Sequence, residues 1–240
     1  MSSVVLGGTR GIGFALASQL LSQKLFRCVV VTGRSKPAEA MPDGMQFVPM
    51  DLSAPEDQLV AACTAVKECA GEALEALFVV AGAAAAGKWN ETKASDMVHS
   101  YQVNVVGPMV VTQQLVPALE KGSGKLLVNV STRMASIDDN GSGGAAAYRC
   151  SKAALNMWNK NLSVELPHIK CVLYHPGIVG TELLAVTFYG KTAKELIATD
   201  AKFASLKTPE KAAAELIAVC MAPTTKSGHF YDYAGKELPW

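Results

Sequence analysis

The chain opens with Val4-Val5-Leu6-Gly7-Gly8-Thr9-Arg10-Gly11-Ile12-Gly13, in which a short apolar run gives way to a glycine-rich turn. Gly7, Gly11 and Gly13 stand in a Gly-x-x-x-Gly-x-Gly arrangement at this turn. Glycines let a backbone approach a pyrophosphate closely, and a helix that follows them offers free N–H groups and the positive end of its dipole. The stretch therefore predicts a strand, turn and helix that bind a dinucleotide, rather than a plain glycine-rich turn.

The same alternation of apolar runs and helical periods continues along the chain. Two sets of apolar residues recur every fourth position and predict buried helix stripes: Ile12, Leu16 and Leu20, then Ala154, Trp158, Leu162 and Leu166. Seven runs are expected as strands: 3–6, 27–32, 45–49, 74–80, 125–130, 169–174 and 229–233. Continuously apolar strands indicate a sheet covered on both faces. We expect one doubly wound α/β domain over 1–240, with a mostly parallel seven-stranded sheet.

Composition narrows the function further. The chain has 240 residues, of which 50% are hydrophobic, and a formal net charge of +1, so nucleic acid is not an expected partner. The six cysteines show neither a Cys-x-x-Cys pair nor paired histidines, which argues against a metal site and a disulfide framework. No apolar run approaches the ~20 residues that span a bilayer. We expect a cytoplasmic protein that binds no metal.

Cofactor choice depends on the end of the second expected strand, Val31-Thr32-Gly33-Arg34-Ser35. A carboxylate there would accept from a ribose 2′-hydroxyl, whereas Arg34 and the loop residue Arg10 can clamp a 2′-phosphate. NADP(H) is therefore expected, the alternative being that Arg34 is simply solvated. Asp51 can accept from an adenine amino group or cap a helix, and both interpretations stay open. The expected cofactor set also includes Thr9, Ile12, Leu52, Ala81 and Gly82.

The segment Tyr148-Arg149-Cys150-Ser151-Lys152 places a tyrosine and a lysine four residues apart, on one face of an expected helix. An ammonium at that spacing can favour the phenolate and lower the pKa of Tyr148 from about 10 toward the working pH. The hydroxyl would then serve as a proton donor or acceptor. An exposed amphipathic pair is the alternative, but the glycine-rich turn in the same chain favours the catalytic interpretation.

Together, the glycine turn, the strand order and Tyr-x-x-x-Lys resemble the short-chain dehydrogenase/reductase family, over nearly the whole chain. The segments 127–137 and 147–156 resemble in particular the subgroup that contains the insect Sniffer carbonyl reductase and the bacterial C-factor. The resemblance implies a Rossmann fold in which Tyr148 is the acid/base and Lys152 lowers its pKa and holds the nicotinamide ribose. It gives the carbonyl-orienting hydroxyl to Ser131 or Thr132, with slightly more weight on Thr132. It makes Asn104 part of a proton relay and a neighbour of the cofactor.

The resemblance also assigns a carboxamide-binding segment and reveals departures. His175-Pro176-Gly177-Ile178-Val179-Gly180-Thr181 matches the segment that touches the nicotinamide, which adds Pro176, Gly177, Val179 and Thr181 to the cofactor set. Leu6, Val79 and Val80 replace polar residues that are usual in the family. Exchanging both hydrogen-bond partners for apolar groups can be nearly neutral, so we expect structural drift with catalysis retained.

The expected reaction is reduction of a small aldehyde, ketone or quinone, with NADPH as hydride donor and Tyr148 as general acid. Alcohol oxidation or isomerisation on the same residues stays open, as does a different class of protein, an NADP(H)-binding sensor or interaction protein with little turnover. The loops 83–87 and 134–144 and the segment 181–203 are expected around the substrate. Residues 181–206 form either a lid or a plain surface helix. The apolar run 105–119 and the family resemblance imply a homodimer or homotetramer.

Overall fold

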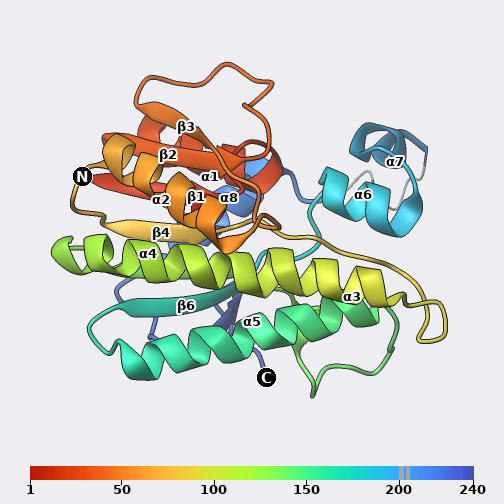
Figure 1. The fold of residues 1–240 in the computed structure, drawn as a ribbon. Helices are drawn as coiled ribbons and strands as arrows, with labels where there is room; N and C mark the ends of the chain where they lie inside the picture. The colour runs from red at the N-terminus through yellow and green to blue at the C-terminus, as the bar shows by residue number, and fades with distance from the viewer. Residues whose placement is uncertain (200–202, 204–205) are drawn as a thin grey trace.

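A single seven-stranded sheet with strand order β3-β2-β1-β4-β5-β6-β7 forms the centre of the computed structural model, which describes residues 1–199, 203 and 206–240 (Figure 1). Every neighbouring pair of strands is parallel. The strands are β1 (Ser2–Leu6), β2 (Cys28–Gly33), β3 (Met45–Pro49), β4 (Ala76–Val79), β5 (Leu126–Val130), β6 (Lys170–His175) and β7 (Phe230–Asp232). The order reverses between β1 and β4, where ligands bind in open α/β sheets.

Helices cover both faces of the sheet, as the continuously apolar strands predicted. They are α1 (Gly11–Ser22), α2 (Glu56–Ala70), α3 (Ala94–Tyr101), α4 (Gly107–Lys121), α5 (Ala146–Glu165), α6 (Glu182–Tyr189), α7 (Ala193–Thr199) and α8 (Pro209–Cys220). Short helical turns, η1 (Gln102–Val106) and η2 (Arg133–Ala135), precede α4 and follow β5. The doubly wound parallel fold is thus confirmed.

The side chains of β1 show how the two hydrophobic cores are separated. Val4 and Leu6 point into a core with α2, α4 and α5, whereas Val5 points into a second core with α1 and α8. Successive side chains of a strand face opposite sides of a sheet, and both sides are dry here because both carry helices. This packing fixes the carboxyl end of β1, and hence the glycine turn, in the middle of the molecule.

Two details of the predicted elements differ from the structure. Leu74 was expected in a strand, but β4 begins at Ala76, and the Leu74 N–H donates to the Ala118 carbonyl at 2.9 Å. Leu74 is fully buried, so its apolar character reflects packing of a connection. The expected stripe on α5 is also wrong in part. Of its four members Leu162 is buried and Trp158 and Leu166 pack partly buried against the same core, but the buried face also carries the polar residues Ser151, Lys152, Asn156 and Asn159.

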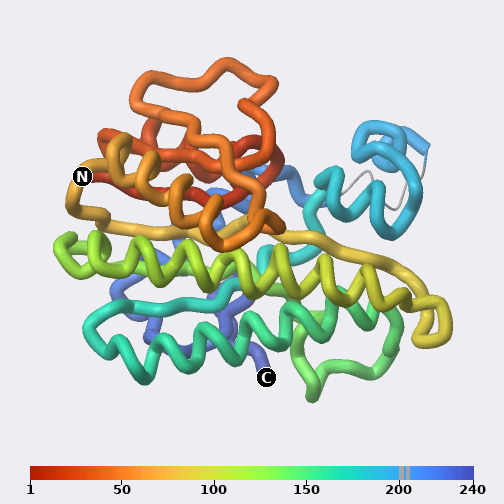
Figure 2. The backbone as a smooth tube through the Cα atoms, in the orientation of Figure 1, coloured from red at the N-terminus to blue at the C-terminus, as the bar shows by residue number. Residues whose placement is uncertain are grey.

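The helices α6 and α7 stand beyond one end of the sheet (Figures 1 and 2). Ala185, Leu196 and Phe203 form a small hydrophobic cluster of their own there. The expected start of α8 is confirmed, because the Thr208 side chain accepts from Lys211 N and Pro209 begins the helix. The expected lid at 181–206 includes residues 200–202, 204 and 205, which lie outside the described residues.

Within the described ranges, no helix is long and apolar enough to cross a membrane. The same ranges contain no group of three or more His, Cys, Asp or Glu residues placed to hold a metal ion. All six cysteines are free thiols, and only Cys150 is exposed.

Candidate active site

The glycine turn between β1 and α1 is held by close backbone contacts. The N–H groups of Gly7 and Gly8 both donate to the Thr32 carbonyl at 3.0 Å, and Gly7 has a φ of +80°. A Cβ on Gly13 would lie 2.1 Å from the Gly7 carbonyl oxygen. No side chain caps the start of α1, so its first N–H groups are left without a side-chain acceptor. The arrangement matches the predicted pyrophosphate cradle.

A cavity of about 590 Å³ lies in front of this turn. Twelve of the predicted cofactor residues line it: Gly7, Thr9, Arg10, Gly11, Ile12, Gly13, Arg34, Asp51, Leu52, Ala81, Gly82 and Thr181. Six others lie outside that lining: Asn104, Tyr148, Lys152, Pro176, Gly177 and Val179. The cavity is therefore lined by the expected phosphate and adenosine residues and, of those expected at the nicotinamide end, by Thr181.

The charged residues at the far end of the cavity follow β2 and β3. Arg34 is exposed at the end of β2, and Asp51 follows β3. The Ser53 hydroxyl, and to a smaller extent the Ser53 backbone N–H, donate to Asp51 Oδ1 and hold the pKa of Asp51 below its usual range. The helix-cap interpretation of Asp51 is wrong, because α2 begins at Glu56 with Pro55 in the cap position.

The cavity also includes residues that the sequence patterns did not select. Lys36 follows Arg34 in the same loop and adds a second positive charge. His99 and Val103 reach the cavity from α3 and η1. Lys36 could have been found from its place beside Arg34. His99 carries no sequence signal, because only the packing of α3 brings that helix to the cavity.

Asn104 is buried at the centre of a π-helical turn, η1, which joins α3 to α4. Its side-chain amide donates to the Ala83 carbonyl at 2.8 Å and to Ser151 Oγ at 2.9 Å. Its Oδ1 accepts from the Ala83 N–H at 2.8 Å. One side chain therefore joins the loop after β4 to α5, and a π turn often marks such a functional position.

The two hydroxyl candidates after β5 point in different directions. Ser131 Oγ donates to Asn156 Oδ1 at 2.6 Å inside the core. Thr132 Oγ1 accepts from the Met134 N–H at 3.2 Å, and it lies near enough to the Tyr148 hydroxyl to lower the pKa of that group. Of the two hydroxyls, that of Ser131 is engaged with Asn156, whereas that of Thr132 interacts with the tyrosine.

The Tyr148 and Lys152 side chains differ from the expected electrostatic pair. Burial raises the pKa of Tyr148 to about 12, and the hydrogen bond with Thr132 acts in the opposite direction. Burial lowers the pKa of Lys152 to about 8, and its Nζ donates to the Val130 carbonyl at 2.9 Å. The pKa of Tyr148 is thus raised by burial, opposite in direction to the lowering predicted from Lys152. The Tyr148 hydroxyl therefore keeps its proton at neutral pH.

Lys152 nevertheless stands at the edge of the cavity. A Cβ on Gly82, which lines the cavity, would lie 3.4 Å from Asn104 Oδ1 and 3.5 Å from Lys152 Nζ. Gly82, Lys152 and Asn104 are neighbours, and together they connect the cavity with α5, the helix that carries Tyr148. These contacts and the glycine cradle fit a nicotinamide dinucleotide that runs from Arg34 toward Tyr148.

The segment expected at the carboxamide lies between β6 and α6. Pro176 O accepts from Lys207 Nζ at 2.9 Å, and a Cβ on Gly177 would lie 2.9 Å from the Tyr233 ring. Val179 forms a β-bridge with Lys207. Thr181 lines the cavity and caps α6. Of this segment, therefore, Thr181 is the predicted residue that faces the cofactor cavity.

The chain belongs to the short-chain dehydrogenase family, because residues 2–192 match the model of that family, described as short chain dehydrogenase. Among curated proteins it is 32% identical to the C-signal protein of Myxococcus xanthus over 167 residues, 68% of this chain and 91% of that protein. Members of the family are oxidoreductases that act on CH–OH or C=O groups, and the chain is one of them.

Solved structures agree with this assignment. A carbonyl reductase from chicken fatty liver, solved with NADPH bound, is 27% identical with a TM-score of 0.80, covering 100% of this chain and 98% of that chain. The carbonyl reductase Sniffer of D. melanogaster shares the fold, with a TM-score of 0.79 and 24% identity over 100% of this chain and 99% of its own. The resemblance to the Sniffer and C-factor subgroup is confirmed.

Proposed function

We propose that this protein is an NADPH-dependent carbonyl reductase that acts on a small aldehyde, ketone or quinone. The observation that carries the proposal is the convergence of Thr132 and Tyr148 on one another, with Lys152 and Asn104 behind them at the edge of the dinucleotide cavity. A nicotinamide dinucleotide supplies the hydride when it is bound. The protein groups around it supply binding, orientation and the proton.

Each side chain has a role that follows from its surroundings. Burial raises the pKa of Tyr148, so its hydroxyl keeps its proton until that proton is transferred to the carbonyl oxygen of the substrate. Thr132 donates a second hydrogen bond to that oxygen and fixes its position. Lys152 and Asn104 carry the proton that restores Tyr148. Loss of the proton from Tyr148 in turn favours a charged Lys152.

The preference for NADPH rests on Arg34 and Arg10. Both line the cavity, and Lys36 adds a third positive side chain at the same end. A guanidinium pairs with a phosphate through two parallel hydrogen bonds, whereas a ribose diol is best held by a carboxylate. The chicken carbonyl reductase, which shares the fold and was solved with NADPH, supports this preference.

The substrate side is mostly apolar. The loop 83–87 is built of alanines and Gly87, and Phe188 of α6 stands edge-on to the Tyr148 ring with centroids 6.3 Å apart. Uncharged carbonyl compounds suit these walls, because no charge needs to be desolvated on entry.

Turnover is tested by following NADPH consumption with a panel of aldehydes, ketones and quinones, and with NADH as the control. Tyr148→Phe is expected to lower kcat by about 10³-fold and leave NADPH binding unchanged, which is the scale of general acid catalysis. Full activity in that variant contradicts the mechanism. Tight NADPH binding by the wild type without turnover of any compound favours the sensor.

A second pair of variants distinguishes the roles of Thr132 and Ser131. Thr132→Val keeps the shape and removes the hydroxyl, and kcat is expected to fall about 10²-fold. Ser131→Ala is expected to keep kcat within about threefold and to lower stability by about 1 kcal/mol through loss of the bond to Asn156. The reverse ranking of kcat contradicts the assignment.

The sensor alternative rested on Val79 and Val80. Val79 is 1% exposed in the core with α2 and α4, and Val80 packs against the core with α1. Both residues therefore have a packing explanation that leaves the reaction side chains in place, and this favours the reductase.

The proposal includes a cytoplasmic homodimer or homotetramer. Most apolar side chains of the run 105–119 are buried in the hydrophobic core of the subunit. They include Val110, Val111, Leu115 and Leu119. Exposed apolar side chains are also found on α3 and α5, where Val98, Met157 and Val164 are 69%, 64% and 68% exposed. Light scattering of the wild type and a Met157→Glu, Val164→Glu variant tests whether this surface holds subunits together.

A further inference from the structure

Arg149 is a side chain of the Tyr148 helix that the proposed reaction does not use. It is the fourth residue of α5 and directly follows Tyr148. Its Nη1 donates to the Met134 carbonyl at 3.0 Å. The Met134 N–H in turn donates to Thr132 Oγ1 at 3.2 Å. A short chain of hydrogen bonds therefore runs from the neighbour of Tyr148 to the hydroxyl that faces Tyr148.

The remaining donors of Arg149 hold the far part of the same loop. Its Nε donates to the carbonyls of Gly143 and Gly144 at 3.2 and 3.0 Å, and its Nη2 donates to Ser142 Oγ at 2.8 Å. Gly143 and Gly144 have φ values of +61° and +69°. Glycines in such conformations give the loop little stiffness of its own, so the rigid guanidinium fork orders it.

The helix itself does not explain an arginine at this position. A cation in the first turn of a helix faces the positive end of the helix dipole, which is unfavourable. Arg149 offsets that repulsion with carbonyl oxygens from the loop. A role in the loop therefore accounts for the residue better than a role in helix stability.

The loop that Arg149 holds also contacts the opposite wall of the substrate side. The Ala145 N–H, directly after Gly144, donates to the Gly87 carbonyl at 2.8 Å. Gly87 closes the loop 83–87, whose Ala83 is bound by Asn104. Movement of the Gly143 and Gly144 carbonyls would consequently be passed to both loops beside Tyr148.

We propose that Arg149 is a positioning residue that closes the base of the loop 133–145 and so fixes the Thr132 hydroxyl against Tyr148. The inference rests on the proposed function for its effect on turnover. Its effect on the loop does not depend on any reaction. Arg149 does not line the dinucleotide cavity, so it acts through Met134 and Thr132.

The test compares Arg149→Met, which removes every donor, with Arg149→Lys, which keeps one charge but not the fork. Arg133→Met is the matched control. Arg133 lies on the same loop and pairs with Asp139 at 2.7 Å, but its side chain is 62% exposed and does not bridge to α5. Assays use the full chain with saturating NADPH.

Arg149→Met is expected to lower kcat about tenfold or more with the KM for NADPH within about twofold, because displacement of a reacting group is costly. Arg149→Lys recovers part of that loss, and Arg133→Met stays within about twofold of the wild type. Equal kcat values for Arg149→Met and wild type overturn the proposal. An equal decrease of kcat in Arg149→Met and in the Arg133→Met control also overturns it.

Hydrogen exchange of the Met134 amide gives a readout that needs no turnover. That N–H is bound to Thr132 Oγ1, and Arg149→Met is expected to speed its exchange about tenfold, with amides of β1 and α1 unchanged. Unchanged exchange at Met134 overturns the proposal even if activity falls. Faster exchange in a protein that reduces no carbonyl supports the positioning role and contradicts the proposed reaction.

Discussion

The two sides of the candidate site are built by different means. On the dinucleotide side, the turn 7–13 is fixed by atoms that nearly touch, so a Cβ on Gly13 would meet the Gly7 carbonyl at 2.1 Å. On the substrate side, a Cβ on Gly141 would find nothing within 4 Å. There, Arg149 and backbone bonds to the last residue hold the loop, since Ile137 and Asp138 N–H donate to Trp240 O. Close packing tolerates almost no substitution, whereas a loop held by side chains can change with its substrate.

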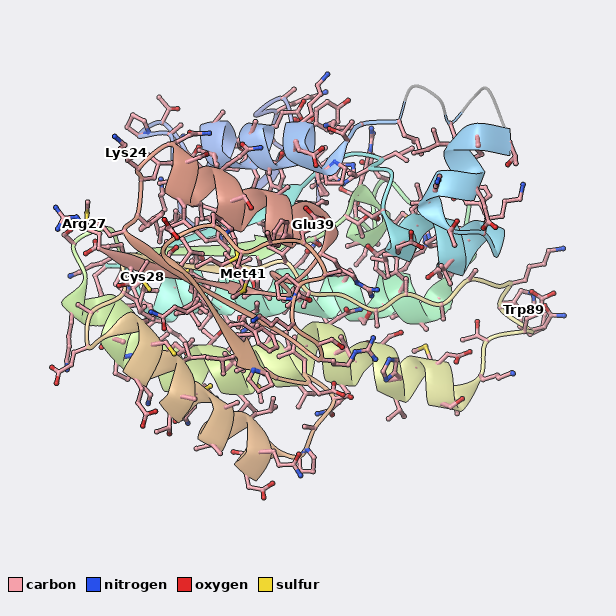
Figure 3. The ribbon with its side chains drawn as sticks, turned by 90° about the horizontal axis from the view of Figure 1, so that it is seen from above. Lys24, Arg27, Cys28, Glu39, Met41 and Trp89 are labelled. Atoms are coloured by element: carbon pink, nitrogen blue, oxygen red, sulfur yellow. The ribbon has the colours of Figure 1, made fainter. Side chains whose placement is uncertain are left out.

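The loop between β4 and α3 shows the same contrast within a few residues. Val79 and Val80 are packed in the cores at its start, whereas Trp89 is 85% exposed. Figure 3 shows Trp89 at the outer tip of this loop, at the opposite end of the molecule from Lys24 and Arg27. Burial thus decreases from the sheet outward along this loop.

The largest expected effect is at the glycine turn. Gly13→Ala is expected to cost about 3 kcal/mol or more of unfolding free energy and to abolish dinucleotide binding, because backbone must move to admit the Cβ. Gly141→Ala, the matched control in the open loop, is expected to change stability by about 0.5 kcal/mol or less. Urea unfolding with and without NADPH measures both. Equal effects at the two glycines would remove the distinction between the two sides.

Asn104→Ala is expected to cost about 2 to 3 kcal/mol, because the Ala83 N–H and C=O and Ser151 Oγ all lose a partner. Gln102→Ala, in the same π turn but only half-buried, is the control and is expected to cost less than about 1 kcal/mol. Thermal unfolding compares them. A cost for Asn104→Ala no greater than that of the control would show that the bridge between loop and helix is not stabilising.

Lys152→Met is expected to raise stability by about 2 kcal/mol at pH 7 while turnover is lost. Burial lowers the pKa of Lys152 from 10.5 in the unfolded chain to about 8 in the folded one, so the buried ammonium opposes folding. The lost bond to the Val130 carbonyl offsets part of the gain. Such an exchange of stability for activity is common at functional sites.

The pH dependence of that gain has a definite sign. Below pH 8 both states hold the proton and the full cost of burial is present; between pH 8 and 10.5 the unfolded state binds more protons, so wild-type stability rises. The advantage of Lys152→Met should therefore shrink over this window. Lys160→Met, exposed on the same helix, is the control. A gain that stays constant from pH 7 to 10 contradicts a buried charged lysine.

The smallest expected effect is at the exposed end of the cavity. Arg34→Ala is expected to weaken NADPH binding about tenfold, or ~1.4 kcal/mol, and to leave NADH binding unchanged. Arg27→Ala, just before the other end of β2, controls for loss of one positive charge. Fluorescence titration measures both cofactors. An equal loss of affinity for NADPH and NADH would show that Arg34 does not bind the 2′-phosphate.

Most of the sheet could be predicted because the central strands are apolar on both faces, a pattern that needs no tertiary information. The predictions were wrong where an apolar residue packs outside a strand and where a helix buries polar residues. Leu74 is buried in a connection, and α5 buries Lys152, Asn156 and Asn159, which form hydrogen bonds with Val130, Ser131 and Asn129 in β5 and directly after it. Periodicity counts apolar residues and cannot register a polar face that is paired with another element.

The parallel sheet, the glycine turn after β1 and the order of the site residues along the chain could all be inferred from the amino-acid sequence, because these depend on local sterics and on periods of two and 3.6 residues. Folding was needed to bring Ser131 to Asn156 and Thr132 to Tyr148, to make Asn104 join two elements and to let Arg149 reach back to Met134. It also decided the pKa directions of Tyr148 and Lys152. Hydrogen-bond partners and desolvation are set by residues distant in sequence, which come together only when the chain has folded.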